Sequence, residues 1–174
     1  MNKKIIKNYF DFFKIKQEYE INKTKLKYLW QNLLFKIHPD NFDKKYVNVE
    51  EITNEISIFV NEAYFTLKNP ISRAEYICKK ETKNNISKKS ISLNNIFLEK
   101  QIKWYEQINK IDRKIKDNKF IFLKNDFLIL NKKVNIIITE LIDRKKFFFV
   151  AIKYIKALNF IKNFLKRINK YYIY

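Results

Sequence analysis

The chain has 174 residues and no glycine, and its 37 lysines and arginines against 18 aspartates and glutamates give a formal net charge of +19. Hydrophobic residues make up 47% of the sequence, which is enough to bury a core and excludes disorder caused by low hydrophobicity. Because phosphate-binding loops and dinucleotide fingerprints require glycine at fixed positions, P-loop NTPases and Rossmann enzymes are excluded as well.

The composition also limits metal, disulfide and membrane classes. Cys78 and His38 are single residues of their types, so the chain can hold neither a Cys/His zinc site nor an iron–sulfur cluster on its own thiolates, and we expect no cofactor. The longest apolar run, residues 147–152, is far shorter than the roughly 20 residues that span a bilayer, and residues 1–8 lack the apolar centre of a secretory signal. We therefore expect a protein of the reducing cytoplasm without a membrane partner.

The positive charge has two interpretations. Lys, Ile, Asn, Phe and Tyr, whose codons are rich in A and T, make up well over half of the chain, whereas residues with GC-rich codons are scarce. Most of the charge therefore reflects base composition, and a polyanion-binding surface is the second interpretation.

Apolar residues recur at helical spacing and proline occurs only twice, which predicts an all-α protein. A short apolar helix is expected around residues 9–15. An amphipathic helix follows from the N-cap Asn22 to the residue before Pro39, and a second runs over about residues 49–68. The two long helices are expected to pack as an antiparallel hairpin with an exposed loop at residues 38–45.

A short fourth helix is expected to open with Asn69 as its N-cap and Pro70 in its first turn. Beyond a polar linker at residues 81–92, three further stretches of helical periodicity predict an up-down-up bundle with polar turns at residues 117–119 and 143–145. Four aromatic residues of the hairpin are expected in the core: Trp30, Phe35, Phe59 and Phe65. Cys78 is expected to be a small buried hydrophobe.

His38, Pro39 and Asp40 stand at the end of the first long helix. A histidine beside an aspartate can act as a general base, but residues two apart around a proline are not expected to share a hydrogen bond, and the sequence places no serine or cysteine nucleophile. The tripeptide is therefore not expected to be catalytic. What distinguishes it from an ordinary loop is its place in a helical hairpin, after a basic amphipathic helix.

This arrangement resembles a J-domain. The residues that carry the resemblance are Tyr9, Phe10 and Phe13; Tyr28, Leu29, Leu33, Lys36 and Ile37 leading into His38-Pro39-Asp40; and Asn61, Glu62, Ala63, Tyr64, Thr66 and Leu67. The chain resembles most closely the HscB family, the J-domain co-chaperones of iron–sulfur cluster assembly. That likeness is carried by residues 8–13, Tyr19, residues 38–42, Leu67-Lys68-Asn69-Pro70, Arg73-Ala74-Glu75-Tyr76 and Phe97-Leu98.

The resemblance implies a two-domain, L-shaped, all-α co-chaperone that is not itself an enzyme. The J-domain, a helical hairpin with flanking short helices, would occupy residues 1–80. Residues 81–92 would be the linker, and residues 93–174 a C-terminal three-helix bundle that binds a scaffold protein.

In J-domains the His-Pro-Asp loop and the positive face of the preceding helix dock on a DnaK-type chaperone, here expected to be HscA, and stimulate its ATPase. The resemblance therefore assigns chaperone binding to His38, Pro39 and Asp40, with Asp40 the most sensitive position. Lys25 and Lys36 lie eleven residues apart and so share one side of the helix, and with Lys27 they are expected to meet an acidic chaperone surface.

HscB proteins bind the cluster scaffold IscU through apolar and acidic residues on the first helix of the bundle. The matching positions here are Leu98, Ile102 and Glu106, at i, i+4 and i+8 on one helical face. The chain departs from the family pattern at Glu99, Lys103 and Ala157, where the family tends to have an apolar residue, an acid and an aromatic residue.

Two alternatives stay open at this point. A general J-domain co-chaperone would deliver unfolded proteins and show no preference for a cluster scaffold. A basic nucleic-acid-binding helical protein is suggested by the charge and by aromatic residues interleaved with lysine over residues 166–174, although nucleic acid is not the expected partner.

Overall fold

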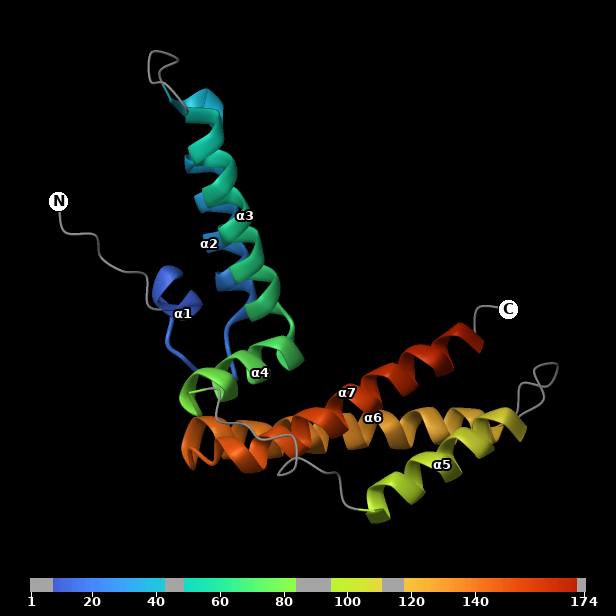
Figure 1. Ribbon diagram of the computed structural model, residues 1–174. Helices are drawn as coiled ribbons and strands as arrows, with labels where there is room; N and C mark the ends of the chain where they lie inside the picture. Colours follow the sequence, from blue (N-terminus) through green and yellow to red (C-terminus); the bar gives the residue numbers. More distant parts are fainter. Residues whose placement is uncertain (1–7, 43–48, 84–94, 111–117, 172–174) are drawn as a thin grey trace. The chain divides into compact units, whose positions relative to one another are not determined.

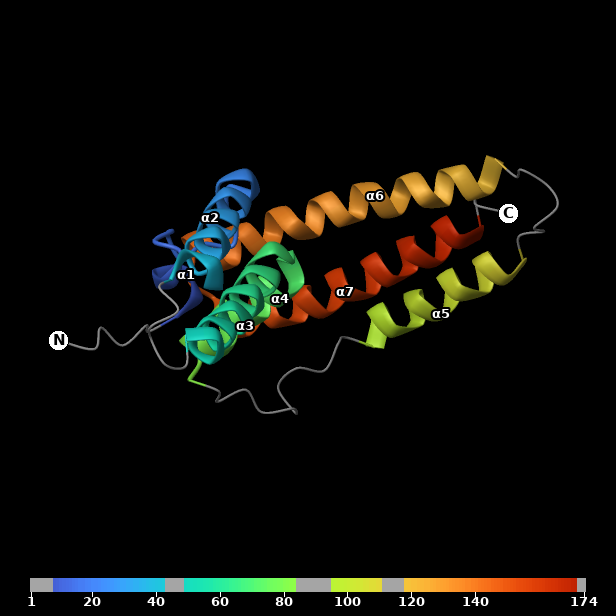
Figure 2. The same cartoon turned by 90° about the horizontal axis from the view of Figure 1, so that it is seen from above.

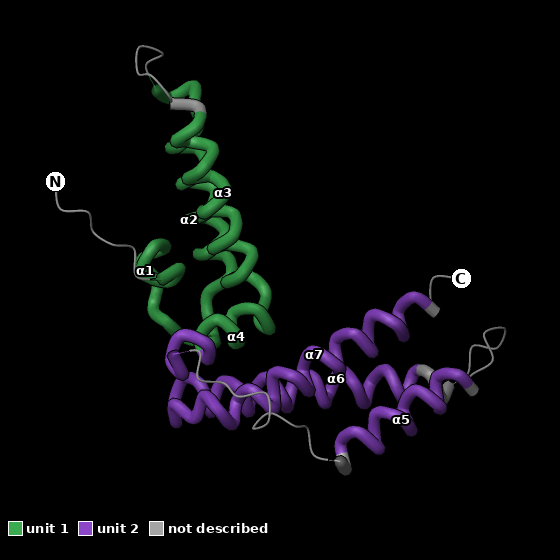
Figure 3. The backbone as a smooth tube through the Cα atoms, viewed as in Figure 1, with its two compact units in different colours: residues 1–77 green, residues 78–174 purple. Residues whose placement is uncertain are grey.

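The computed structural model describes residues 8–42, 49–83, 95–110 and 118–171 (Figure 1). Every regular element in these ranges is helical, which confirms the all-α class predicted from the sequence. The chain divides into two compact units, Met1–Ile77 and Cys78–Tyr174 (Figure 3). Residues 84–92 of the predicted linker lie outside the described residues.

The first unit contains α1 (Tyr9–Phe12), α2 (Lys23–Lys36), the 3-10 turn η1 (Pro39–Asn41), α3 (Val49–Lys68) and most of α4 (Pro70–Glu81). Asparagine begins three of these helices. The side-chain oxygens of Asn8, Asn22 and Asn69 accept hydrogen bonds from backbone N–H groups in the first turns of α1, α2 and α4. The N-caps predicted at Asn22 and Asn69 are therefore confirmed.

The core of the first unit lies where α1, α2 and α3 meet (Figures 1 and 2). The side chains that α3 buries follow helical spacing: Val60, Ala63, Tyr64 and Leu67. Elsewhere in the first unit, four further large side chains are equally buried: Phe10, Phe13, Tyr19 and Leu26. The predicted hairpin is thus present, with α2 and α3 side by side.

The prediction that the large aromatic residues of the hairpin lie in its core is only partly right. Trp30 and Phe59 are partly buried, and the Trp30 ring stacks on the buried Tyr64 ring with centroids 4.2 Å apart. Phe35 and Phe65 are exposed over 75% and 57% of their surface. The apolar stripes on α2 and α3 are wider than the strip two helices can bury against each other, so residues at the stripe edges stay in water.

The side chain of Arg73 fastens α4 to the hairpin. Only 3% of its surface is exposed, its Nε donates to the Tyr19 carbonyl at 2.7 Å, and its Nη1 donates to the Leu67 carbonyl. The guanidinium also lies over the Tyr19 ring, 5.2 Å from its centre. Leu67 belongs to the last turn of α3, where carbonyls have no partner within the helix, so Arg73 supplies a donor that the helix end requires.

Tyr9 attaches α1 to α3 and α4. Its ring stacks on Tyr76 at 4.5 Å and meets Phe59 edge-on, and its hydroxyl donates to Glu62 Oε1 at 2.8 Å. Its backbone N–H donates to the Tyr76 hydroxyl at 3.0 Å. Burial, together with the hydrogen bond and the negative charge of Glu62, raises the pKa of Tyr9 to about 12.

The second unit contains α5 (Asn95–Lys110), α6 (Asn118–Thr139), the π-helical turn η3 (Glu140–Arg144) and α7 (Phe148–Tyr171). Residue 117 of the turn predicted at 117–119 lies outside the described residues, and the rest of that prediction is wrong, because α6 already begins at Asn118. The predicted turn at 143–145 is largely the widened turn η3, which closes when the Lys145 N–H bonds the Glu140 carbonyl at 3.0 Å.

A cluster of aromatic rings holds α5 against α6 and α7. Trp104 of α5 lies 4.9 Å from Phe127 and 5.8 Å from Phe160, measured between ring centroids. Phe127 in turn stacks on Phe164 at 4.1 Å.

In the described ranges, no helix combines the length and the apolar character that crossing a membrane requires.

Three lysines adopt the left-handed backbone conformation that favours glycine. Lys14, Lys83 and Lys146 have φ values of 52°, 50° and 58° and follow α1, α4 and η3. At Lys14 the N–H of Ile15 bonds the Phe10 carbonyl at 3.0 Å, as in a Schellman helix end. Since the chain has no glycine, these helix ends carry a steric strain of about 1 to 2 kcal/mol each.

Replacing Lys14 by glycine should therefore stabilise the first unit. Relief of the strain outweighs the greater freedom of glycine in the unfolded chain, so Lys14→Gly should raise the free energy of unfolding in urea by about 0.5 to 1 kcal/mol. The control Gln31→Gly, at an exposed position inside α2, should lower it by about 1 kcal/mol. A loss of stability in Lys14→Gly would contradict the assignment of strain.

The pKa of Tyr9 predicts how α1 responds to alkali. A phenol whose pKa is raised on folding contributes stability that is fully present below pH 10, its ordinary value, and is lost as the pH rises through about 12. Tyr9→Phe should therefore be less stable than the original chain near neutral pH, and the difference should shrink above pH 10. In an absorbance titration at about 295 nm the variant should lack a phenol that ionises near pH 12; loss of one ionising near pH 10 would argue against this contact.

Candidate partner-binding site

The turn η1 places Asp40 in solvent directly after α2. The Asn41 N–H bonds the His38 carbonyl at 2.9 Å and the Phe42 N–H bonds the Pro39 carbonyl at 3.1 Å, so the turn is closed by its own backbone. The side chain of Asp40 is exposed over 85% of its surface, and among the residues that the structure describes His38 is its one ion-pair partner. The geometry thus offers a fixed carboxylate to a partner.

His38 caps this turn. Its Nδ1 accepts a hydrogen bond from the Asp40 N–H at 3.3 Å and also lies 3.3 Å from Asp40 Oδ2. The expectation that these two residues share no hydrogen bond is wrong, because the 3-10 turn brings the backbone N–H and the carboxylate of Asp40 to the imidazole. An Nδ1 without a proton caps the Asp40 backbone N–H, whereas a proton on Nδ1 would allow this nitrogen to donate to the carboxylate instead.

Asn41 is a site residue that sequence reasoning missed. Its side-chain Nδ2 donates to the carbonyl of Phe35 in the last turn of α2. This bond ties η1 to a helix end whose carbonyls have no partner within the helix. The sequence offered one indication of this role, because asparagine side chains in turns tend to bond the local backbone.

The three lysines assigned to chaperone binding are all exposed, but they do not share one face. At about 100° per residue, Lys25 and Lys36 are about 20° apart around α2, whereas Lys27 is about 160° from Lys25. The packed side of α2, marked by the buried Leu26, lies between them. Lys25 and Lys36 therefore form one flank of α2 and Lys27 belongs to the other.

The outer face of α2 carries two aromatic side chains that were not identified as site residues. Tyr28 and Phe35, seven residues apart and so nearly in line along the helix, are exposed over 63% and 75% of their surface. Phe42, after the turn, is 41% exposed. The surface around Asp40 is therefore aromatic as well as basic.

The residues assigned to scaffold binding lie on the exposed side of α5. Leu98 and Ile102 are exposed over 43% and 60% of their surface, and Glu106 is exposed. Glu99 and Lys103 are exposed beside them, whereas Ala157 on α7 is only 9% exposed. The patch is thus available on α5, and Ala157 adds nothing to a surface.

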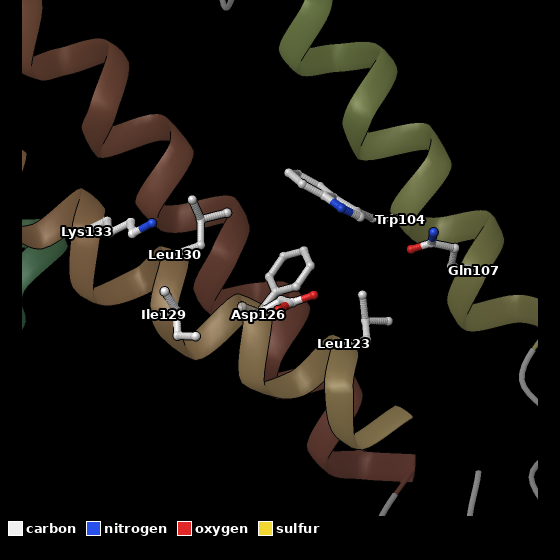
Figure 4. A pocket seen from close by; sticks show the side chains of 8 residues that line it. Trp104, Gln107, Leu123, Asp126, Ile129, Leu130 and Lys133 are labelled. Atoms are coloured by element: carbon white, nitrogen blue, oxygen red, sulfur yellow. The ribbon is translucent and has the colours of Figure 1, made fainter. Parts of the chain in front are cut away.

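A groove of about 420 Å³ separates α5 from α6 (Figure 4). Trp104 and Gln107 line it from α5, and Leu123, Leu130 and the buried Phe127 line it from α6. Asp126, Ile129 and Lys133 stand at its α6 edge. Within the described ranges, no three His, Cys, Asp or Glu side chains come together as a metal site.

The sequence is similar to those of curated co-chaperones, although no family model matches it. It is 39% identical over 70 residues to a protein named co-chaperone protein HscB homolog from Colwellia psychrerythraea, covering 40% of each chain. It is 28% identical over 134 residues to the homolog of that name from Neisseria meningitidis, covering 68% of this chain and 81% of that one. The first alignment spans less than half the length of its relative.

Two solved structures share the fold over most of the chain. The chaperone HscB from Vibrio cholerae matches with a TM-score of 0.78 and 21% identity, covering 94% of this chain and 96% of that one. Human co-chaperone protein HscB matches with a TM-score of 0.81 and 18% identity, covering 95% and 82%. The expected HscB-like fold is therefore confirmed.

Removal of the Asn41 amide should loosen the turn without unfolding the unit. In Asn41→Ala the backbone N–H groups of Asn41 and Phe42 should exchange with deuterium about fivefold faster or more, because one hydrogen bond to α2 is lost. Asn32→Ala, at an exposed position of α2, serves as the control and should leave both rates unchanged. Equal rates in all three proteins would mean that the Asn41 bond does not order the turn.

Proposed function

We propose that this chain, a member of the HscB co-chaperone family, is a co-chaperone of iron–sulfur cluster assembly that acts in the cytoplasm and is not itself an enzyme. Its first unit stimulates the ATPase of a DnaK-type chaperone, HscA, and its second unit delivers the scaffold protein IscU. The observation that carries the proposal is the closed turn η1, which holds the Asp40 carboxylate in solvent at the end of a helix with a basic flank.

Asp40 is the central contact in this proposal. A carboxylate fixed on a short turn forms a charge-assisted hydrogen bond, bidentate if the partner is an arginine, with little loss of conformational freedom. Pro39 limits the backbone of the turn, and the caps from His38 and Asn41 hold it on α2. The contact accelerates hydrolysis only if it favours the hydrolysis-competent state of the chaperone over the resting state.

The basic contribution to this contact comes from one flank of α2. Lys25 and Lys36 are placed together to meet an acidic chaperone surface, and Lys27 contributes to the field of the helix from the opposite flank. The exposed rings of Tyr28 and Phe35 between these flanks give the same surface an apolar centre.

In this proposal the second unit binds IscU, the protein substrate of the chaperone. Leu98 and Ile102 provide the apolar part of a scaffold-binding patch on α5, and Glu106 provides a charged rim. Because one chain holds both partners, the scaffold is presented to the chaperone at a high effective concentration. The iron–sulfur cluster is cargo on the scaffold and needs no ligand from this chain.

An ATPase assay of HscA with and without IscU tests both halves of the proposal. Asp40→Asn should reduce stimulation about tenfold, since it removes the charge of the central contact. Glu55→Gln, at an exposed carboxylate of α3, is the matched control and should stimulate normally. Equal stimulation by Asp40→Asn and the original chain would refute the proposed role of the turn.

Ile102→Asp should stimulate HscA normally in the absence of scaffold and lose the additional stimulation that IscU brings. Its matched control is Ile58→Asp, an isoleucine of α3 that is 68% exposed. If a denatured protein replaces IscU with equal effect, the chain is a general J-domain co-chaperone. Tight nucleic-acid binding with a steep salt dependence, without ATPase stimulation, would favour the nucleic-acid alternative.

A further inference from the structure

The outer face of α6 carries a line of exposed apolar side chains. Phe122, Ile129 and Ile136 are exposed over 69%, 52% and 68% of their surface and recur every seven residues. Since side chains seven residues apart lie nearly in line along a helix, the three form one stripe about 21 Å long. The stripe lies opposite the residues through which α6 packs, Phe127, Val134 and Ile138.

This stripe has the spacing of a helix–helix seam without a partner helix. Within the second unit α6 is already packed on its other side by α7, and the cluster around Trp104 holds α5 (Figure 2). Isolated exposed isoleucines are common on protein surfaces, but a heptad-spaced line of three large side chains indicates a face that buries against another helix.

Charged side chains of opposite sign lie on the two sides of Ile129 along the helix, Asp126 before it and Lys132 and Lys133 after it. Asp126 and Lys133 are both exposed, and with Ile129 they line the groove beside Trp104 (Figure 4). Within the described residues, neither side chain has an ion-pair partner. A second α6 laid antiparallel with its Ile129 on the first Ile129 brings Asp126 of each copy next to Lys133 of the other, and Phe122 opposite Ile136.

We propose that this face of α6 is a self-association surface, through which two copies of the chain form an antiparallel dimer about a two-fold axis at Ile129. A two-fold interface requires a patch that is complementary to itself, and the stripe satisfies this requirement in both its apolar and its charged residues. The groove beside Trp104 adjoins the stripe, so side chains of the second copy can also enter it.

A second copy fits these observations better than an acidic partner does. A surface for an acidic partner would be bordered by cations alone, whereas this stripe is bordered by the carboxylate of Asp126 as well as by the amines of Lys132 and Lys133. The contact area of one helix pair is small and each chain carries a charge of +19, so we expect a weak dimer with a dissociation constant of about 10 to 100 µM.

Sedimentation equilibrium of the full chain in about 0.3 M salt, where repulsion between the chains is screened, tests the proposal. The original chain should dimerise. Asp126→Lys and Lys133→Asp should each raise the dissociation constant about tenfold, because each turns two attractive pairs into two repulsive ones. The control Lys153→Asp, with the same charge change on α7, should dimerise normally.

Mixing the two weakened variants gives the sharpest result. In a mixed dimer the position of Asp126→Lys in one chain faces that of Lys133→Asp in the other, and the second pair is the unchanged Lys133 and Asp126. Both pairs are attractive, so the mixture should form a heterodimer about as stable as the original dimer. Absence of self-association up to about 0.5 mM, or dimers that neither single variant weakens, would overturn the proposal. The proposal would also be overturned if Ile129→Lys weakened IscU binding and left self-association unchanged, because the stripe would then be a scaffold contact.

Discussion

The architecture of the first unit depends on the buried guanidinium of Arg73. It donates to the carbonyls of Tyr19, in the segment before α2, and of Leu67, at the end of α3, so three parts of the chain meet at one side chain. Tyr76, one turn further along α4, then positions Tyr9 and with it α1. The family resemblance rested partly on the run Arg73-Ala74-Glu75-Tyr76. This run therefore has a structural role, because its contacts fix where α2 and its terminal turn lie.

The absence of glycine shapes the rest of the molecule. Helix ends that would ordinarily use glycine use lysine in a left-handed conformation, and the chain passes from α6 to α7 through a π-helical turn. Asparagine, which the same base composition favours, begins three helices. Compositional bias thus changed which residues close the helices while leaving the arrangement of the helices recognisable.

The sequence allowed the residues of the candidate site to be named, but it predicted their positions and contacts less well. His38, Pro39 and Asp40 could be identified because both the tripeptide and the helical pattern around it can be read from the sequence. The contribution of Asn41 was missed because the tendency of asparagine to bond the local backbone does not tell which carbonyl it reaches, and the turn had to be seen for Phe35 to be identified as the partner. Lys27 was grouped with Lys25 and Lys36 by proximity in sequence, although two residues in a helix place it on the opposite flank.

The sequence by itself determined the helices, their caps at Asn22 and Asn69, and the position of the exposed turn, because periodicity, proline and capping residues act locally. Only the tertiary structure decided which apolar residues are buried. Phe35 and Phe65 look like core residues in sequence and lie in water, because burial depends on which part of a helix another element covers. For the same reason the stripe Phe122, Ile129 and Ile136 was indistinguishable from a core face until the exposure of its side chains and the packing of α7 on α6 were seen.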